Sequence, residues 1–235
     1  MAAVISDVQA LTFDVFGTVV DWRSGVIREG RALRPDVDWL PFADDWRRLY
    51  RPTLERVIRG ELPWATFDEL QRLMLDQVLA DRHVEGLTED EKASLSTVWR
   101  RLDPWPDAAP GLSRLKERFV VAALSNGSMW QLICLAKHGR LPWDAIISVE
   151  LFHAYKPDPR VYLGAAELLQ LRPEQVLMVA AHVYDLRAAR SHGLRTAFVA
   201  RPAEWGPDAA PERPDPGEFD LVADSFEDLA ARLDA

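Results

Sequence analysis

Four apolar runs in the sequence are each followed by a side chain that can take part in chemistry. Asp14 and Ser125 end the first two runs, and Lys156 and Asp185 come a few residues after two later ones. A carboxylate can act as a nucleophile, an acid or a base, and a hydroxyl beside free backbone amides can bind an anion. Asp14 would also suit a plain structural role as a helix cap or loop acid after a buried strand.

The apolar runs themselves predict the parallel strands of an α/β fold. Residues 119–124 show no alternation between apolar and polar side chains, which is typical of a strand covered on both faces. Strands and helices alternate along the chain, so we predict a doubly wound, Rossmann-like parallel sheet. Ligands bind at the carboxyl ends of strands in such sheets, where the four side chains would meet. The predicted strands are 8–13, 119–124, 145–149, 176–180, 195–199 and 220–223.

A helical pattern interrupts the strands for about eighty residues after the first strand. Apolar side chains recur at helical spacing in 43–58, 67–79 and 88–102. We interpret residues 19–103 as a helical cap inserted into a core formed by residues 1–18 and 104–235. A cap of this kind closes over the crevice and excludes water.

Composition limits the class of protein. The chain has 235 residues, a net charge of −9 and one cysteine, Cys134, which we expect to be a small core residue. The net negative charge argues against nucleic acid as a partner. No apolar run in the sequence is long enough to span a membrane, so we predict no membrane segment. Met1–Asp7 lacks the features of a signal peptide, so we expect a cytoplasmic protein, with a homodimer as an open option. The proline-rich stretch 201–220 predicts a long surface loop.

The segment Phe13-Asp14-Val15-Phe16-Gly17-Thr18 resembles the first motif of the haloacid dehalogenase superfamily. The leading aspartate of that motif is a catalytic nucleophile, and phosphatases of the superfamily carry a second, acid-base aspartate two positions later, beside Mg²⁺. Phe16 stands at that position here, and its ring neither protonates a leaving group nor activates water. The resemblance therefore implies the dehalogenase branch, with Asp14 as the nucleophile, Thr18 orienting it, and no metal or other cofactor.

Two further segments resemble the second and third motifs. Ser125-Asn126-Gly127-Ser128 is similar to a motif that binds an anion through its hydroxyl and backbone amides, with the asparagine close to the halide; such a triplet is also a common turn. Lys156-Pro157-Asp158-Pro159 resembles the motif whose lysine lies beside the nucleophile and keeps it ionised. Asp158 and Pro159 suit the start of a helix. Tyr162, on that helix, matches a tyrosine near the active site of dehalogenases, although a packing role also fits.

The fourth motif is matched in part. The resemblance implies that Asp185 orients Lys156 and helps to place the hydrolytic water. Well-known L-2-haloacid dehalogenases carry a serine and an asparagine just before this acid, where the present chain has Ala180 and His182. His182 would either contact the water, as an acceptor or general base, or merely fill the asparagine's place and bond to the backbone.

The cap supplies the remaining candidates. Arg47 resembles the arginine that accepts the halide in dehalogenases, although the adjacent Arg48 leaves the register open by one residue. Both arginines would equally suit a solvated helix face. Phe16, Trp64 and Tyr184 are expected to contribute to an aromatic wall around the substrate.

The resemblance implies hydrolysis of short L-2-haloalkanoic acids to D-2-hydroxy acids and halide. Asp14 would displace the halogen from the opposite side to form an aspartyl ester, and water would then attack the ester carbonyl carbon. Three alternatives remain at this point: a Mg²⁺-dependent phosphatase or phosphotransferase, a fluoroacetate-type defluorinase, and a non-catalytic protein that keeps Asp14 by descent.

Overall fold

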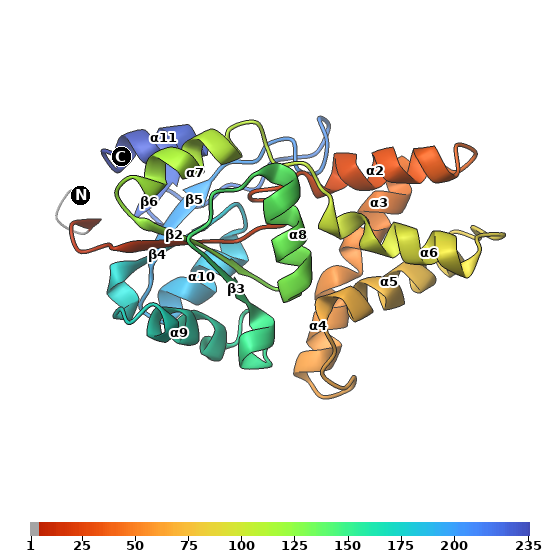
Figure 1. Cartoon of the computed structure of the whole chain (residues 1–235), viewed down its shortest axis with the longest axis horizontal. Coiled ribbons are helices and arrows are strands. Elements are labelled where there is room, and N and C mark those ends of the chain that lie inside the picture. The colour runs from red at the N-terminus through yellow and green to blue at the C-terminus, as the bar shows by residue number, and fades with distance from the viewer. Residues whose placement is uncertain (1–4) are drawn as a thin grey trace.

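A parallel sheet forms the centre of the molecule in the computed structural model, which describes residues 5–235 (Figure 1). Within these residues the sheet has six strands in the order β3-β2-β1-β4-β5-β6, and every neighbouring pair is parallel. The central strand β1 is fully buried, and its sequence is apolar apart from Thr12. The predicted fold class is confirmed. The strands are β1 Ala10–Phe13, β2 Val120–Ser125, β3 Ala145–Ser148, β4 Val176–Ala180, β5 Arg195–Val199 and β6 Leu221–Ala223.

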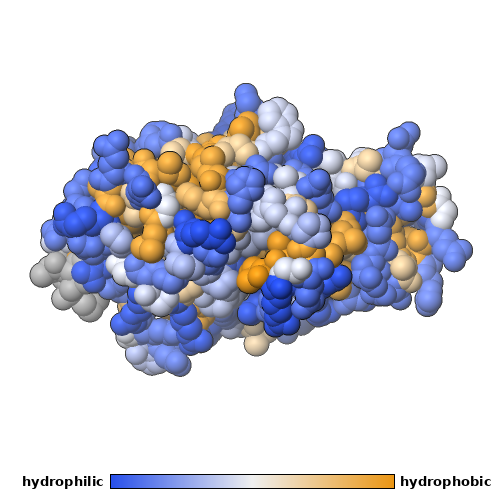
Figure 2. Space-filling model, turned by 90° about the horizontal axis from the view of Figure 1, so that it is seen from below, coloured by the Kyte–Doolittle hydropathy of each residue, from blue (hydrophilic) through white to orange (hydrophobic). Residues whose placement is uncertain are grey.

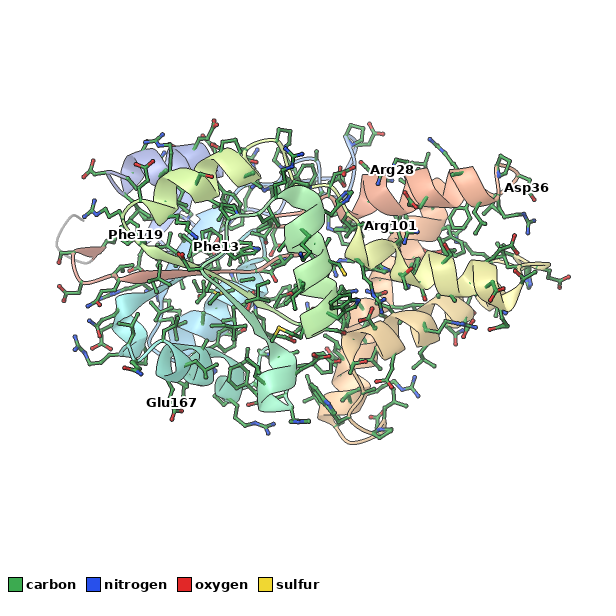
Figure 3. The ribbon with its side chains drawn as sticks, viewed as in Figure 1. Phe13, Arg28, Asp36, Arg101, Phe119 and Glu167 are labelled. Carbon is green, nitrogen blue, oxygen red and sulfur yellow. The ribbon has the colours of Figure 1, made fainter. Side chains whose placement is uncertain are left out.

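Helices cover both faces of this sheet. Helices α7 and α11 pack together on one face, and α9 and α10 lie on the other (Figure 1). Phe13, at the end of β1, lies inside this layered core between the rings of Trp143 and Phe226 (Figure 3), with centroids 5.5 and 5.3 Å away. The strand that leads to Asp14 is therefore held on both sides. The core helices are α7 Ala108–Lys116, α8 Met129–Gly139, α9 Pro159–Leu168, α10 Val183–Ser191 and α11 Phe226–Arg232, with 3₁₀ turns at Val149–Phe152 and Pro173–Gln175.

A second, all-helical layer lies beside the carboxyl ends of the strands, on the right in Figure 1. Four fully buried tryptophans, Trp22, Trp39, Trp46 and Trp99, pack its interior. Its helices are α2 Trp22–Leu33, α3 Trp39–Arg48, α4 Tyr50–Ile58, α5 Phe67–Asp81 and α6 Glu89–Ser96, followed by a 3₁₀ turn at Thr97–Arg100.

Two helix predictions in this layer were wrong in their extent. The predicted helix 43–58 is broken at Leu49 into α3 and α4. Pro52 has no N–H and its ring would clash with the carbonyl of residue 48, so a continuous helix cannot form. The predicted helix 88–102 ends at Ser96 and continues only as a 3₁₀ turn.

The chain crosses between core and cap at two neighbouring points. Val20 bridges to Pro104, Asp21 N donates to Asp103 O at 2.9 Å, and Trp105 N donates to Val19 O at 2.9 Å. The outgoing and returning segments thus lie side by side. We keep residues 19 and 103 as the proposed ends of the cap; the first four residues of the proposed core lie outside the described residues.

Two features of the surface bear on the sequence predictions. Cys134 is partly exposed on α8, so its assignment to the core was wrong. The apolar run around Cys134 led to this prediction, but a run of that kind on a helix at the surface of the sheet also includes partly exposed positions. In the part of the chain that the structure describes, no helix combines the length and apolar character needed to cross a membrane.

Candidate active site

Asp14 follows β1 directly, and its carboxylate is held from several sides. Its backbone N–H donates to Val179 O at 3.0 Å, and its Oδ2 accepts from Thr18 Oγ1 at 2.9 Å. Thr18 Oγ1 in turn accepts from the Ala181 N–H at 3.0 Å, which leaves its own proton to point at Asp14. The tight turn after β1 thus supplies an oriented donor for one oxygen of the carboxylate.

Lys156 lies between two carboxylates. Its Nζ is 2.7 Å from Asp185 Oδ2 and 3.5 Å from Asp14 Oδ1, and its side chain is almost fully buried. Tyr162 Oη donates to the other Asp185 oxygen at 2.5 Å. Sequence positions 14, 156, 162 and 185 therefore meet at the carboxyl ends of the strands.

The two carboxylates differ in their proton affinity. Burial raises the pKa of Asp14, but Lys156, His182 and Thr18 outweigh it and bring that pKa well below its ordinary value. Burial also raises the pKa of Asp185, and Lys156 offsets this only in part because Asp14 adds a further negative charge. Asp14 is thus a stable anion, and Asp185 is the group that accepts a proton more readily.

His182 joins Asp14 to an acid that the sequence did not single out. Its Nδ1 is 3.0 Å from Asp14 Oδ2, and its Nε2 is 3.1 Å from Glu204 Oε1. Burial lowers the pKa of His182, but the Glu204 and Asp14 carboxylates reverse this and raise it to about 10. Both nitrogens therefore carry protons at neutral pH and both face carboxylates, so the expected bond to the backbone is contradicted. A contact between His182 and the hydrolytic water stays a prediction.

The loop that carries Glu204 is not the plain surface loop that was predicted. Glu204 is buried and also accepts from Trp22 Nε1 at 3.0 Å. Arg201 donates through Nε to Thr18 O at 2.8 Å and forms an ion pair with Asp107 at 2.9 Å. The first residues of this proline-rich stretch are thus fastened to the turn after β1, which brings Glu204 into the site.

The segment after β2 bonds mainly to the protein itself. Ser125 Oγ accepts from Gly127 N at 3.2 Å, Asn126 Oδ1 accepts from Lys156 N at 2.9 Å, and Asn126 Nδ2 donates to Tyr50 Oη at 2.7 Å. At the start of the following helix α8, Met129 N donates to the Glu150 carboxylate, so this N-terminal amide is bonded within the protein. Asn126 therefore links the lysine segment to cap helix α4.

Arg47 and Arg48 have opposite surroundings. The Arg47 guanidinium is buried, 4.5 Å from the ring centre of Tyr50 and 5.6 Å from that of Trp22. Its Nη1 has no hydrogen-bond acceptor among residues 5–235. Arg48 is exposed and pairs with Asp45 at 2.7 Å. Among the residues that the structure describes, Arg47 is thus a buried cation with no ion pair, the condition under which a small anion would be bound.

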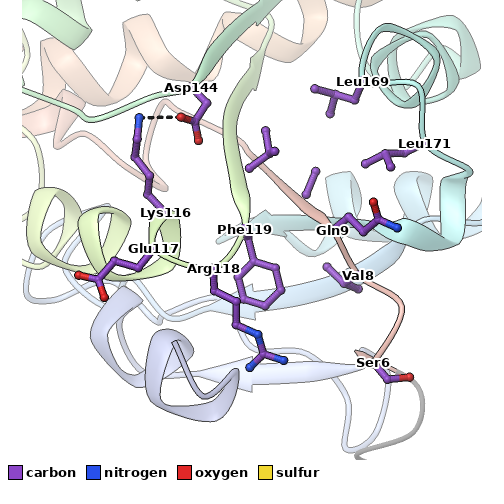
Figure 4. Close-up of a pocket in the computed structure, with 12 residues that line it drawn as sticks. Ser6, Val8, Gln9, Lys116, Glu117, Arg118, Phe119, Asp144, Leu169 and Leu171 are labelled. Carbon is purple, nitrogen blue, oxygen red and sulfur yellow. Dashed lines mark ion pairs between the residues drawn. The ribbon is translucent and has the colours of Figure 1, made fainter.

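A pocket of about 500 Å³ opens between cap and core at this point. Its lining includes Arg47, Tyr50, His182, Tyr184 and Trp205, together with three further arginines. Two other cavities hold none of the predicted site residues. One is an apolar groove along α9, on the face seen in Figure 2, and the other is a cleft of about 710 Å³ at the amino ends of β1 and β2, where the Lys116–Asp144 ion pair lies (Figure 4).

The remaining aromatic candidates lie in different places. Tyr184 packs on His182 at 5.6 Å and faces the pocket. Phe16 is buried between Phe67 and Trp99 of the cap. Trp64 packs against His153 and Tyr155, and its role in a substrate wall stays a prediction.

Comparisons with known proteins agree with this arrangement. The haloacid dehalogenase-like hydrolase family matches residues 8–193. (S)-2-haloacid dehalogenase 1 of Pseudomonas sp. (strain CBS-3) is 32% identical, over 88% of this chain and 91% of that protein. A solved L-2-haloacid dehalogenase is 42% identical with a TM-score of 0.92, covering 96% of this chain and 99% of its own. A solved defluorinating L-2-haloacid dehalogenase is 40% identical with a TM-score of 0.93, covering 97% and 96%. The chain therefore belongs to the haloacid dehalogenase-like hydrolases, in the family of the L-2-haloacid dehalogenases.

Proposed function

We propose that the protein hydrolyses short L-2-haloalkanoic acids to D-2-hydroxy acids and halide through an ester on Asp14. The unequal surroundings of the two Asp14 oxygens carry this proposal. Oδ2 accepts from both Thr18 and His182, whereas Oδ1 has only the longer, 3.5 Å contact with Lys156. The lone pairs of Oδ1 are therefore less engaged in hydrogen bonds than those of Oδ2, and we assign Oδ1 as the attacking atom.

We assign the anions of the reaction to the groups around the pocket. The Arg47 guanidinium, with a buried Nη1 and no ion pair, would receive the departing halide. Ser125 and the backbone amides near it would hold the substrate carboxylate, and Lys156 would offset its charge beside Asp14. Tyr184 and Tyr50 would supply apolar walls.

The first step forms the ester. Asp14 Oδ1 attacks C2 of the haloacid as the carbon–halogen bond breaks on the opposite side, so the configuration at C2 inverts. The halogen leaves with the bonding pair as halide. The Asp14 side chain is only 14% exposed, so its carboxylate has little hydration to lose, which favours this displacement.

The second step releases the product. Water adds to Cγ of Asp14 while one of its protons passes to Asp185, and the Cγ–Oδ1 bond then breaks. Oδ1 leaves in the hydroxy acid and takes a proton from Lys156, which recovers one from Asp185 through their 2.7 Å contact. The new carboxyl group of Asp14 loses its remaining proton to solvent. The sum is one water consumed and one proton released per halide.

The alternatives have less support. Phe16 occupies the place of the acid that a phosphatase of this superfamily would use, and it is packed between Phe67 and Trp99. The buried chain of ionised groups around Asp14 would be costly to keep in a protein without catalytic activity. Defluorination remains a specific option within the proposed chemistry, because a solved defluorinating relative is 40% identical.

The test is halide release from L- and D-2-chloropropionate with EDTA present. We expect halide from the L form only, together with D-lactate, and no halide from Asp14→Asn. A parallel assay with fluoroacetate and L-2-fluoropropionate measures tolerance of fluorine. Absence of halide from every one of these acids, in a protein shown by circular dichroism to be folded, would overturn the proposal. Phosphate release that needs Mg²⁺ would favour the phosphatase instead.

A further inference from the structure

An unbroken line of side chains runs from the cap through the loop after β5 to the nucleophile. Trp22 Nε1 donates to Glu204 Oε1, which faces His182 Nε2 at 3.1 Å, and His182 Nδ1 faces Asp14 Oδ2 at 3.0 Å. His182 and Glu204 are both buried, with side chains 7% and 6% exposed. Neither Glu204 nor Trp22 takes part in the two proposed steps of the reaction.

The geometry fixes which groups are donors. Glu204 Oε1 accepts from both Trp22 and His182, because its pKa is lowered, despite burial, by the histidine and it remains a carboxylate. His182 therefore keeps its Nε2 proton toward Glu204 and its Nδ1 proton toward Asp14 Oδ2. Thr18 directs a second proton at the same oxygen, since its own Oγ1 accepts from Ala181.

The turn after β1 is shaped to admit Glu204. Gly17 has φ +89°, and a Cβ built there would lie 2.2 Å from Glu204 Oε1 and 3.1 Å from the His182 ring. Any side chain at position 17 would therefore collide with the acid. Glycine at this position serves the close approach of Glu204 to His182 as well as the turn.

We propose that His182 and Thr18 form the oxyanion site for hydrolysis of the Asp14 ester, and that Glu204 is the positioning residue that keeps His182 charged and aimed at Oδ2. This inference rests on the proposed function. Once Oδ1 carries the substrate carbon, Oδ2 is the carbonyl oxygen of the ester. When water adds to Cγ, the carbonyl electron pair moves to Oδ2, and both donors are already in hydrogen-bond contact with it.

The role of Glu204 follows from what happens to charge during the reaction. Esterification removes the negative charge of Asp14, so His182 loses one of its two anionic partners before the second step begins. Glu204 remains and holds the imidazolium in place until the oxyanion forms. A positive donor that is fixed in advance stabilises that oxyanion without reorganisation. Glu204 should therefore affect hydrolysis and leave displacement of the halide largely unchanged.

The test is a double-mutant cycle with Glu204→Gln, His182→Asn and the double variant, using L-2-chloropropionate. Rapid quenching measures halide released in the first turnover, steady-state assays measure hydroxy acid, and mass spectrometry detects ester on the peptide that contains Asp14. For Glu204→Gln we expect a first-turnover rate within about threefold of wild type, turnover lower by about 10²–10³-fold, as for loss of one oxyanion donor, and accumulated ester. In the His182→Asn background, Glu204→Gln should cause no further loss.

Each other outcome has a definite meaning. Equal slowing of the first turnover and of hydrolysis in Glu204→Gln would overturn the inference, as would unchanged turnover. An undiminished loss in the His182→Asn background would assign Glu204 a structural role alone and would also overturn it. Absence of any halide release from the wild-type enzyme would instead refute the proposed function, so the two failures are distinguishable. The burst itself reports that each variant is folded and binds substrate.

Discussion

Arg47 differs from most charged residues of this protein because two rings lie beside its guanidinium and it forms no ion pair with a carboxylate of residues 5–235. A buried cation lacking a partner costs stability, and such a cost is typical of residues kept for binding. Its neighbour Arg48 has the same side chain on the same helix but faces water and pairs with Asp45. A substitution of Arg47 can therefore be tested with the same substitution of Arg48 as its control.

We expect Arg47→Met to lower kcat/KM for L-2-chloropropionate by about 10²–10³-fold, because a charged donor to the leaving halide is removed. Its free energy of unfolding should not fall, since the variant removes an unpaired buried charge. Arg48→Met should stay within about twofold in activity, as expected for loss of an exposed ion pair. Steady-state kinetics and urea unfolding measure both quantities. Equal losses in the two variants would contradict the assignment of Arg47.

At the scale of elements, the cap is fastened to the core by hydrogen bonds that reach the site. Asn126 joins α4 through Tyr50, Ser128 Oγ accepts from Asp68 N at the start of α5, and Tyr155 Oη donates to Ala65 O. The first of these also holds the segment that carries Lys156. Cap helix α4 and the segment that carries Lys156 are therefore coupled through Asn126.

Tyr50→Phe removes the acceptor for Asn126 and tests this coupling. We expect a loss of about 1 kcal/mol in the free energy of unfolding and a rise of up to about tenfold in KM, because one hydrogen bond is lost and Asn126 is less fixed. Tyr155→Phe is the matched control: it also removes one bond between core and cap, so its stability should fall similarly while KM is retained. A rise in KM of the same size in both variants would argue against the special role of Asn126.

The sequence predicted the elements better than the contacts between distant side chains. Strands β4 and β5 match the predicted ranges residue for residue. In β4 the reason is a continuous apolar run between polar segments, which defines a buried strand. Glu204 was missed because one acid among several in a proline-rich stretch has no periodic signal. The only hint was His182 itself, since a histidine in a buried motif needs partners for both nitrogens. The bond that meets this need spans 22 residues of sequence.

For the whole molecule, the raised pKa of His182 makes stability depend on pH. Its value of about 10 in the folded state lies above the ordinary value of 6.5, so protonated His182 stabilises the fold. This contribution is fully present below about pH 6.5 and is lost as pH rises through 10. Over that window the free energy of unfolding should fall by up to about 1.4 kcal/mol per pH unit.

Urea unfolding of wild type and His182→Asn between pH 6 and pH 10 measures this effect. The difference between the two proteins should shrink steadily as pH rises, because the groups other than His182 are common to both proteins and cancel in the difference. A difference that stays constant with pH would show that His182 is neutral in the folded protein, and would remove the charge on which its role at Oδ2 depends.

The paired crossing at Val19–Asp21 and Asp103–Trp105 has a consequence for descent. Because the two ends of the cap already meet, a shorter, longer or unrelated insert can join the core at the same seam without shifting β1 or the turn after it. Evolution can thus exchange the cap, which shapes substrate specificity, while the catalytic residues of the core are retained. We expect new specificities in this lineage to arise by rewriting the insert, and a laboratory graft of a foreign cap at this seam to keep the core folded.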